Sequence, residues 1–173
     1  MRNVEIKARS GDLNKAQEIA ESMDGARLDG TFDQIDTYFR VPSGRLKLRE
    51  VSGTRTWSEL IRYHRPDQTE PKGSDYSLVA VTDPAAMRDV LTGALGVLVE
   101  VRKRRTVYLW RNVRIHLDEV SSLGHFIEFE VVLNEEMDDT TSQHIAGHLL
   151  TRFGIADRDL LAVSYSDLLM QRA

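Results

Sequence analysis

Hydrophobic and polar residues alternate along most of this 173-residue chain, and such alternation is typical of β-strands that bury one face. In an extended segment near the start, Val4 and Ile6 lie on one face, whereas Glu5 and Lys7 lie on the other. With the intervening turn residues, the pattern predicts extended segments at about 2–9, 26–32, 34–41, 44–51, 55–65, 75–82, 98–111 and 112–133. We expect the two segments between 26 and 41 to form one bent strand, and the last segment to divide near 121–124 into two strands.

Four other segments repeat their apolar residues with the spacing of an α-helix: 12–23, a segment that begins at Asp83, 140–152 and 159–171. Asp83 is a favourable N-cap residue, and the proline that follows it fits the first helical position. Residues 66–73 hold two prolines and a glycine among polar residues, so they are predicted to form a loop. A chain of this length fits one core, so we expect a single domain over residues 1–173.

The composition excludes several classes of protein. Hydrophobic residues make up 41% of the chain and charged residues 29%, which is too apolar for a disordered chain, and no apolar run is long enough to cross a bilayer. The absence of cysteine excludes disulfides, a thiolate zinc site and a cysteine nucleophile. The net charge of −4 disfavours general nucleic-acid binding, and the charged segment that follows the first residues leads us to expect no secretory signal. We therefore expect a cytoplasmic protein with no nucleic-acid or membrane partner.

Charged residues of both signs share one face of the predicted strands, and residues of like charge lie close together there. The same-face groups are Glu5, Lys7 and Arg9; Arg45, Lys47 and Arg49; Lys103 with Arg105; Arg114, His116 and Asp118; and Glu128 with Glu130. An antiparallel sheet with one solvated face would produce the same alternation. Neighbouring like charges repel unless an ion of opposite charge lies among them, so we favour a barrel that encloses a polyanion and its metal ions. The amphipathic helices would then cover the apolar outer face.

Six blocks of sequence resemble the CYTH domain, the family of triphosphate tunnel metalloenzymes. They follow the family's order and are Val4–Arg9, Gln34–Phe39, Gly44–Glu50, Lys103–Arg105, Asn112–Asp118 and Leu123–Glu130. The resemblance implies an α+β fold: a closed antiparallel eight-stranded β-barrel, the triphosphate tunnel, with a charged interior and amphipathic helices packed outside. One position departs from the family, because its hallmark Glu-x-Glu-x-Lys here begins with Asn3. An amide lacks the charge that would bind a second metal ion tightly.

The resemblance also implies roles for the charged residues. The implied cofactor is Mg²⁺ or Mn²⁺, since carboxylates that share an ion with substrate phosphates suit these metals. The implied metal ligands are Glu5, Asp118, Glu128 and Glu130; the implied substrate-binding residues are Lys7, Arg45, Lys47, Arg49, Arg62, Lys103, Arg105 and Arg114; and Lys7 and Glu130 are the implied catalytic residues. The place of Arg62 depends on the register of its strand, and Arg114 could instead pair with a nearby carboxylate.

Two other patterns have ordinary explanations. His144 and His148 have a spacing that can bind zinc on a helix, but the sequence around them supplies no third ligand. The basic run at 102–105 lies in a predicted strand, which would turn two residues inward and two outward rather than form a nucleic-acid patch. The chain also lacks a P-loop motif, so any triphosphate site is of another kind.

The overall sequence looks nearest to the class IV adenylyl cyclase-like branch of the family, which implies conversion of ATP to cyclic AMP and pyrophosphate. Hydrolysis of thiamine triphosphate or inorganic tripolyphosphate is the alternative, because both reactions use the same charges. Asn3 also leaves open a non-catalytic protein that senses a triphosphate. The simplest hypothesis for the alternation of apolar and charged residues is a structural β-sheet domain with one solvated face. The expected partner is a small-molecule triphosphate, and a homodimer is left open.

Overall fold

A computed structural model describes residues 3–63, 76–132 and 139–172, without the side chains of Asn3, Tyr76 and residues 139–143. The strands are β1 (Asn3–Arg9), β2 (Arg27–Phe39), β3 (Arg45–Gly53), β4 (Trp57–Tyr63), β5 (Tyr76–Ala80), β6 (Val97–Trp110), β7 (Val113–Val120), β8 (Gly124–Val132) and β9 (Leu160–Leu161). The helices are α1 (Leu13–Glu21), α2 (Pro84–Leu95), α3 (Asp139–Arg152) and α4 (Tyr165–Met170). No described helix is long and apolar enough to cross a membrane.

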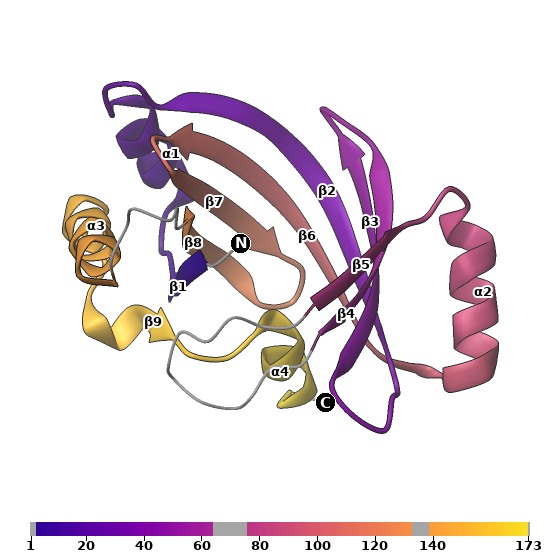
Figure 1. The fold of residues 1–173 in the computed structure, drawn as a ribbon. Coiled ribbons are helices and arrows are strands. Elements are labelled where there is room, and N and C mark those ends of the chain that lie inside the picture. The colour runs from indigo at the N-terminus through magenta and orange to yellow at the C-terminus, as the bar shows by residue number, and fades with distance from the viewer. Residues whose placement is uncertain (1–2, 64–75, 133–138, 173) are drawn as a thin grey trace.

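The strands form one antiparallel sheet in the order β5-β4-β3-β2-β6-β7-β8-β1-β9. In Figure 1, β2 and β6 curve across the back of the molecule, with β3, β4 and β5 on one side and β7, β8 and β1 on the other. Helix α4 lies between the two sides at one end. The prediction of an α+β fold with an antiparallel sheet and four helices is confirmed, but the sheet has nine strands rather than eight. Within the described ranges, no pairing joins β5 to β9 and closes the sheet.

Most predicted elements are found near their expected places. The two extended segments between 26 and 41 form one strand, β2, with a register shift near Gly30. Helix α2 begins after Asp83, whose carboxylate accepts a hydrogen bond from the backbone N–H of Ala86. The predicted loop at 66–73 lies outside the described residues.

The predicted helix over 159–171 is wrong in its first half. Residues Asp157–Asp159 form a short 3-10 turn, and β9 then pairs with Lys7 and Ala8 of β1. The helix begins only after Ser164, because a capping box between Ser164 and Asp167 satisfies the first backbone N–H groups there. The apolar residues Leu160 and Leu161 therefore belong to a strand and not to the helix.

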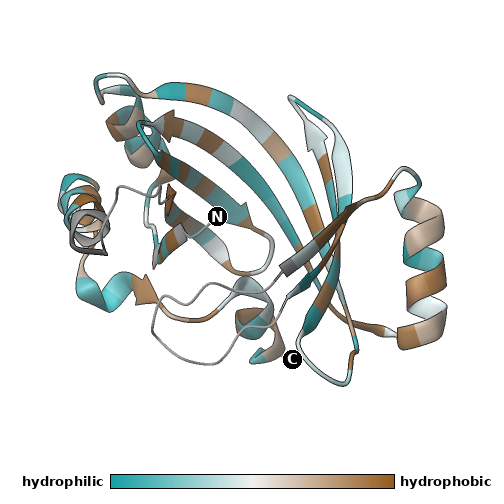
Figure 2. Ribbon diagram, viewed as in Figure 1, coloured by the Kyte–Doolittle hydropathy of each residue, from teal (hydrophilic) through white to brown (hydrophobic). Residues whose placement is uncertain are grey.

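Opposite faces of the sheet have opposite character, and Figure 2 shows hydrophilic and hydrophobic residues alternating along β2 and β6. The outer faces of β7 and β8 pack against α1 and α3 in the largest core cluster, where Ile115, Phe129, Val131 and Leu149 are almost fully buried. Burying a side chain of this size contributes about 1.5–3 kcal/mol, so this cluster fixes the two helices to the sheet.

Two smaller apolar clusters lie toward opposite ends of the inner face, the face that carries the charged residues. The α4 cluster comprises Tyr38, Val101, Val120, Leu123, Phe126 and Tyr165. The hairpin cluster comprises Phe32, Val51 and Val107 and lies beside the β3–β4 turn. Gly53 allows β3 to approach β2 there, since its φ is +124° and a Cβ atom would lie 2.4 Å from the carbonyl oxygen of Thr31.

Candidate functional site

Between these two clusters, the inner face of the sheet carries a band of buried or half-buried charged residues. Strand register brings them together, because Lys7 lies opposite Glu128, Asp36 opposite Arg49 and Arg105 opposite Asp118. We call this set the charged band; its members are Lys7, Asp36, Lys47, Arg49, Lys103, Arg105, Asp118 and Glu128. The predicted gathering of charges on one face is thus present, with the two ends of the band bordered by apolar residues.

One half of the band centres on Asp36 of β2. The guanidinium group of Arg49 donates to both carboxylate oxygens, with Nε at 2.8 Å from Oδ1 and Nη2 at 2.9 Å from Oδ2. Lys47 Nζ and Gln34 Nε2 also donate to Oδ2, at 2.9 and 3.1 Å. Burial alone would raise the pKa of Asp36, but the positive charges of Lys47 and Arg49 hold it well below its usual range. Asp36 is therefore a permanent carboxylate that orients two cations.

The other half of the band joins β1, β6, β7 and β8. Arg105 binds Asp118 through two hydrogen bonds of 2.6 Å and also reaches Glu128 Oε1 at 3.2 Å. Glu128 accepts a 3.0 Å contact from Lys7 Nζ, and its Oε1 lies 2.8 Å from His116 Nδ1. Burial opposes ionisation of both acids, yet Arg105 lowers the pKa of Asp118 and of Glu128 below their usual ranges. Both acids are thus charged at neutral pH.

The lysines of the band differ in how firmly they are paired. Burial would lower the pKa of Lys7, but the carboxylates of Glu128 and Glu5 raise it above its usual value. Burial and the neighbouring Arg105 lower the pKa of Lys103 to about 8, and its Nζ lies 3.6 Å from Asp118 Oδ2. Its carboxylate contact is the longest in the band, so Lys103 is the least closely paired of these lysines.

Tyr165 of α4 contacts the centre of the band, although neither strand periodicity nor a family motif marks it in the sequence. Its hydroxyl donates to Asp118 Oδ2 at 2.8 Å. Its ring centroid lies 4.6 Å from Lys7 Nζ and 5.1 Å from Lys103 Nζ, within the range of cation–π contacts. The serine and aspartate that cap α4 were the available signal for a helix start at this place.

Arg45 binds α4 rather than the charged band. Its Nη1 donates to Ser164 Oγ at 2.9 Å, and its Nη2 lies 2.7 Å from Asp167 Oδ1. Arg45 therefore holds α4, the helix that covers one end of the inner face. The sequence predicted Arg45 as a phosphate ligand and gave no sign of this contact. Arg62 is not brought to the site either, because it lies opposite Leu46 on the outer face and is exposed.

The remaining predicted residues lie at the other end of the band, where the inner face is more exposed. Glu5 and Glu130 are cross-strand partners, and the side chain of Glu5 is 49% exposed. Arg114 Nη1 lies 3.0 Å from Glu130 Oε2, so Arg114 has the carboxylate partner that the sequence left open. Lys7 connects this end to the band, because its Nζ contacts Glu5 Oε1 at 2.9 Å.

The carboxylates at this end have the chemistry for Mg²⁺ or Mn²⁺. Glu5, Glu128 and Glu130 lie on one face at adjacent register positions, and their oxygens are the hard ligands that these ions prefer. Each of the three faces a cationic side chain or histidine, and the described part of the chain holds no group of three acidic or histidine residues arranged around a metal position. Asp118 fits less well, because Arg105 and Tyr165 already occupy its oxygens and it is fully buried.

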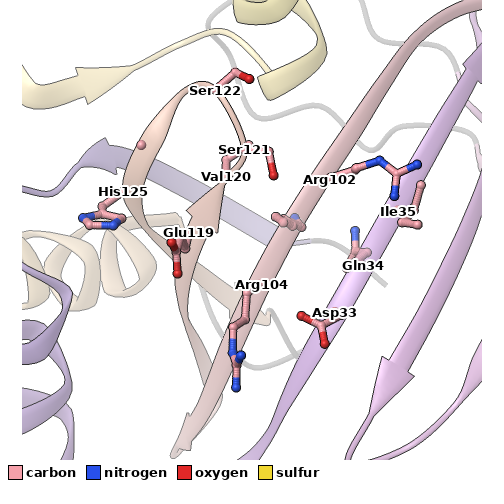
Figure 3. Close-up of a pocket in the computed structure, with 12 residues that line it drawn as sticks. Asp33, Gln34, Ile35, Arg102, Arg104, Glu119, Val120, Ser121, Ser122 and His125 are labelled. Carbon is pink, nitrogen blue, oxygen red and sulfur yellow. The ribbon is translucent and has the colours of Figure 1, made fainter.

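A cavity of about 560 Å³ lies beside the β7–β8 turn (Figure 3). Lys103 is the one residue of the charged band that lines it, and its other charged lining residues lie on the outer face. Asp33, Arg104, Glu119 and His125 cross it in register on four neighbouring strands. Figure 3 shows Arg104 between the two acids. Arg104 lies opposite an acid on each side, so this row holds no excess of positive charge and does not extend the site.

Solved structures share this fold at low sequence identity. The PH1012 protein of Pyrococcus horikoshii has a TM-score of 0.82 and 24% identity, covering 96% of this chain and 98% of its own. The PH1819 protein of the same organism has a TM-score of 0.81 and 21% identity, covering 99% of each chain. A protein from Vibrio parahaemolyticus described as a candidate adenylate cyclase has a TM-score of 0.76 and 18% identity, covering 98% of each chain. At these identities the likeness establishes the fold alone.

Comparison with curated proteins gives no significant match. Comparison with protein-family models gives a more specific result than the solved structures do. The model of the CYTH domain matches residues 1–165. The matched range includes every residue of the charged band as well as Tyr165. The chain therefore belongs to the CYTH domain family.

Proposed function

We propose that this chain is a single-domain, metal-dependent enzyme that binds an organic triphosphate on the inner face of its sheet and cleaves it within the phosphate chain. The observation that carries the proposal is the charge of the band. Five cationic side chains there contact the three carboxylates of the band and, at its edge, Glu5, so cations outnumber their carboxylate partners by one inside a protein of net charge −4. Such an excess, held between two apolar clusters, is suited to a polyanion.

The band's own residues would bind the phosphates by exchanging partners. Lys103 has the longest carboxylate contact, and Arg49 and Lys7 lie on either side of it across the sheet. Phosphate oxygens would accept hydrogen bonds from these cations in place of Asp118, Asp36 and Glu128. Because the donors are already oriented by carboxylates, little rearrangement is needed when the phosphates enter.

Glu5, Glu128 and Glu130 would hold Mg²⁺ or Mn²⁺, which neutralises charge on phosphate oxygens and orients the chain for in-line attack when bound. Phosphoryl transfer depends on positioning and charge stabilisation more than on a dedicated base, so this set of residues is chemically sufficient. Lys7 lies between Glu5 and Glu128 and would join the metal ligands to the phosphate ligands, which supports its role as a catalytic residue.

We infer a reaction of the adenylyl cyclase type, in which the ribose 3′-oxygen bonds to the α-phosphorus as the bond to pyrophosphate breaks. The name of the Vibrio parahaemolyticus relative supports this choice. Thiamine triphosphatase or tripolyphosphatase activity, with water attacking the γ-phosphorus, would use the same residues. Asn3 favours a second class of function, a triphosphate sensor without turnover, because it removes one negative charge from the family's metal-binding segment.

The test is a substrate panel with product identification. The protein is incubated with ATP, thiamine triphosphate or tripolyphosphate in the presence of Mg²⁺ or Mn²⁺. Cyclic AMP and pyrophosphate are the expected products from ATP, whereas orthophosphate release would assign a hydrolase. Thermal stabilisation by these ligands without any product would assign a sensor and contradict the enzyme proposal.

A further inference from the structure

An aromatic surface adjoins the charged band at the end opposite α4. Trp57 begins β4 and lies opposite Val51, so its indole projects on the inner face beside the hairpin cluster. Trp57 is 38% exposed, whereas Phe32 and Val51 are each only 3% exposed. Trp57 is thus an accessible aromatic ring on a buried apolar support.

The ring of Trp57 lies one same-face strand position away from the phosphate-binding cations. Arg49 precedes Val51 by two residues on the inner face of β3, and Phe32 lies directly opposite Arg105. Two residues of extended strand span about 7 Å, which is close to the distance between a bound phosphate and the next group of an organic triphosphate. A ligand whose phosphates contact Arg49 and Arg105 would therefore bring its organic group to the level of Trp57.

The ring is held in place before any ligand binds. Trp57 packs edge-to-face on Phe32, with ring centroids 5.5 Å apart and planes at 76°. Its indole Nε1 donates to Glu59 Oε1 at 2.5 Å. The guanidinium group of Arg55 covers Phe32 at 5.2 Å from the ring centroid, and an ion pair with Asp29 fixes it. A ring restrained in this way loses little conformational entropy when a planar group stacks on it.

The opposite end of the inner face is closed to an organic group. There α4 packs in the α4 cluster, Tyr165 donates to Asp118, and Arg45 binds the residues that begin the helix. A linear triphosphate in the band must therefore direct its organic group away from α4. At that side of the inner face Phe32 and Trp57 offer an aromatic surface, whereas Glu5 and Glu130 offer carboxylates. Continuity with the cationic band also distinguishes this surface from a protein-docking patch.

We propose that Trp57, supported by Phe32, is a binding subsite for the planar heteroaromatic group of an organic triphosphate. This inference rests on the proposed function and deepens it. It predicts that the protein binds a heteroaromatic triphosphate more tightly than inorganic tripolyphosphate, although both carry the same phosphate chain.

The experiment compares ATP, thiamine triphosphate and tripolyphosphate by calorimetric titration with Mg²⁺ present, using wild-type protein and Trp57→Ala. Loss of a stacking ring should weaken binding of the preferred heteroaromatic triphosphate by roughly fivefold to a hundredfold and leave tripolyphosphate affinity unchanged. Trp57→Phe, which keeps a ring, should retain most of the affinity. Val90→Ala on α2, where Val90 is 66% exposed, is the matched control and should leave the affinity for every ligand unchanged.

Tryptophan emission gives a second measurement that does not depend on the alanine variant. The chain has two tryptophans, and Trp110 is only 7% exposed in the core, so ligand-induced quenching should occur in wild type and disappear in Trp57→Phe. The subsite would be overturned if Trp57→Ala bound both heteroaromatic triphosphates with wild-type affinity, or if its affinity for tripolyphosphate fell by the same factor as its affinity for them. Either result would leave the proposed function standing. Failure of wild type to bind tripolyphosphate or either organic triphosphate would overturn both proposals.

Discussion

The hydroxyl of Tyr165 offers a sharp test of how α4 stabilises the charged band. Tyr165→Phe removes one hydrogen bond, of 2.8 Å, to a carboxylate that is fully buried, and it keeps the ring contacts with Lys7 and Lys103. A hydrogen bond to a charged group contributes about 1.5–3 kcal/mol, and the upper part of that range applies because water cannot replace the lost donor. We therefore expect the free energy of unfolding to fall by about 2–3 kcal/mol.

Urea unfolding at pH 7 measures this change, and the dependence of the free energy on urea concentration should stay the same. Tyr108→Phe is the matched control, since the Tyr108 hydroxyl donates at 2.7 Å to the exposed carboxylate of Glu21. Water can hydrate Glu21 after the deletion, so the control should lose less stability than Tyr165→Phe. Equal losses in the two variants would refute the argument that burial of Asp118 sets the magnitude.

Three further predictions concern the band and its ends. Asp36→Asn should lower stability at pH 7 by about 3–5 kcal/mol, because two cations lose a buried counter-charge. The pKa of Asp36 in the folded protein lies below its unfolded value of about 3.9. The stabilisation that ionised Asp36 contributes is therefore present above that pH and is lost as the pH falls through the folded pKa. Urea midpoints measured between pH 2 and 7 should fall less steeply with decreasing pH in the variant than in wild type. Glu130→Ala should abolish Mg²⁺-dependent turnover with little change in the urea midpoint, and full activity would remove Glu130 from the metal site. Arg49→Ala should weaken tripolyphosphate binding by about 1.5–3 kcal/mol, whereas Arg62→Ala on the outer face should leave the calorimetric affinity unchanged.

Strand periodicity explains why so much of the band could be predicted. Residues two apart in a strand share a face whatever the tertiary fold, so Lys103 and Arg105 were placed together correctly from their spacing alone. The same rule could not place Arg62, because its position depends on where β4 begins relative to β3. A shift of one residue moves a side chain from one face to the other.

The contacts of α4 could not be predicted for a different reason. Arg45 and Ser164 are separated by 119 residues, and Tyr165 and Asp118 by 47, so neither contact leaves a local pattern. Strand β9 has two residues, too few for any alternation to indicate a strand. These long-range contacts decide whether Arg45 binds a ligand or a helix, and only the assembled fold contains them.

The place of β1 in the sheet has a consequence for the order in which the protein can assemble. Its neighbours are β8 and β9, which a ribosome produces long after β1 itself. Until they emerge, Lys7 has no Glu128 beside it and Asp118 has no Tyr165, so the nascent chain must keep these groups in water. Pairings that distant in sequence make folding slow compared with that of helical proteins of similar length. Completion of the sheet therefore has to wait until β9 has been synthesised.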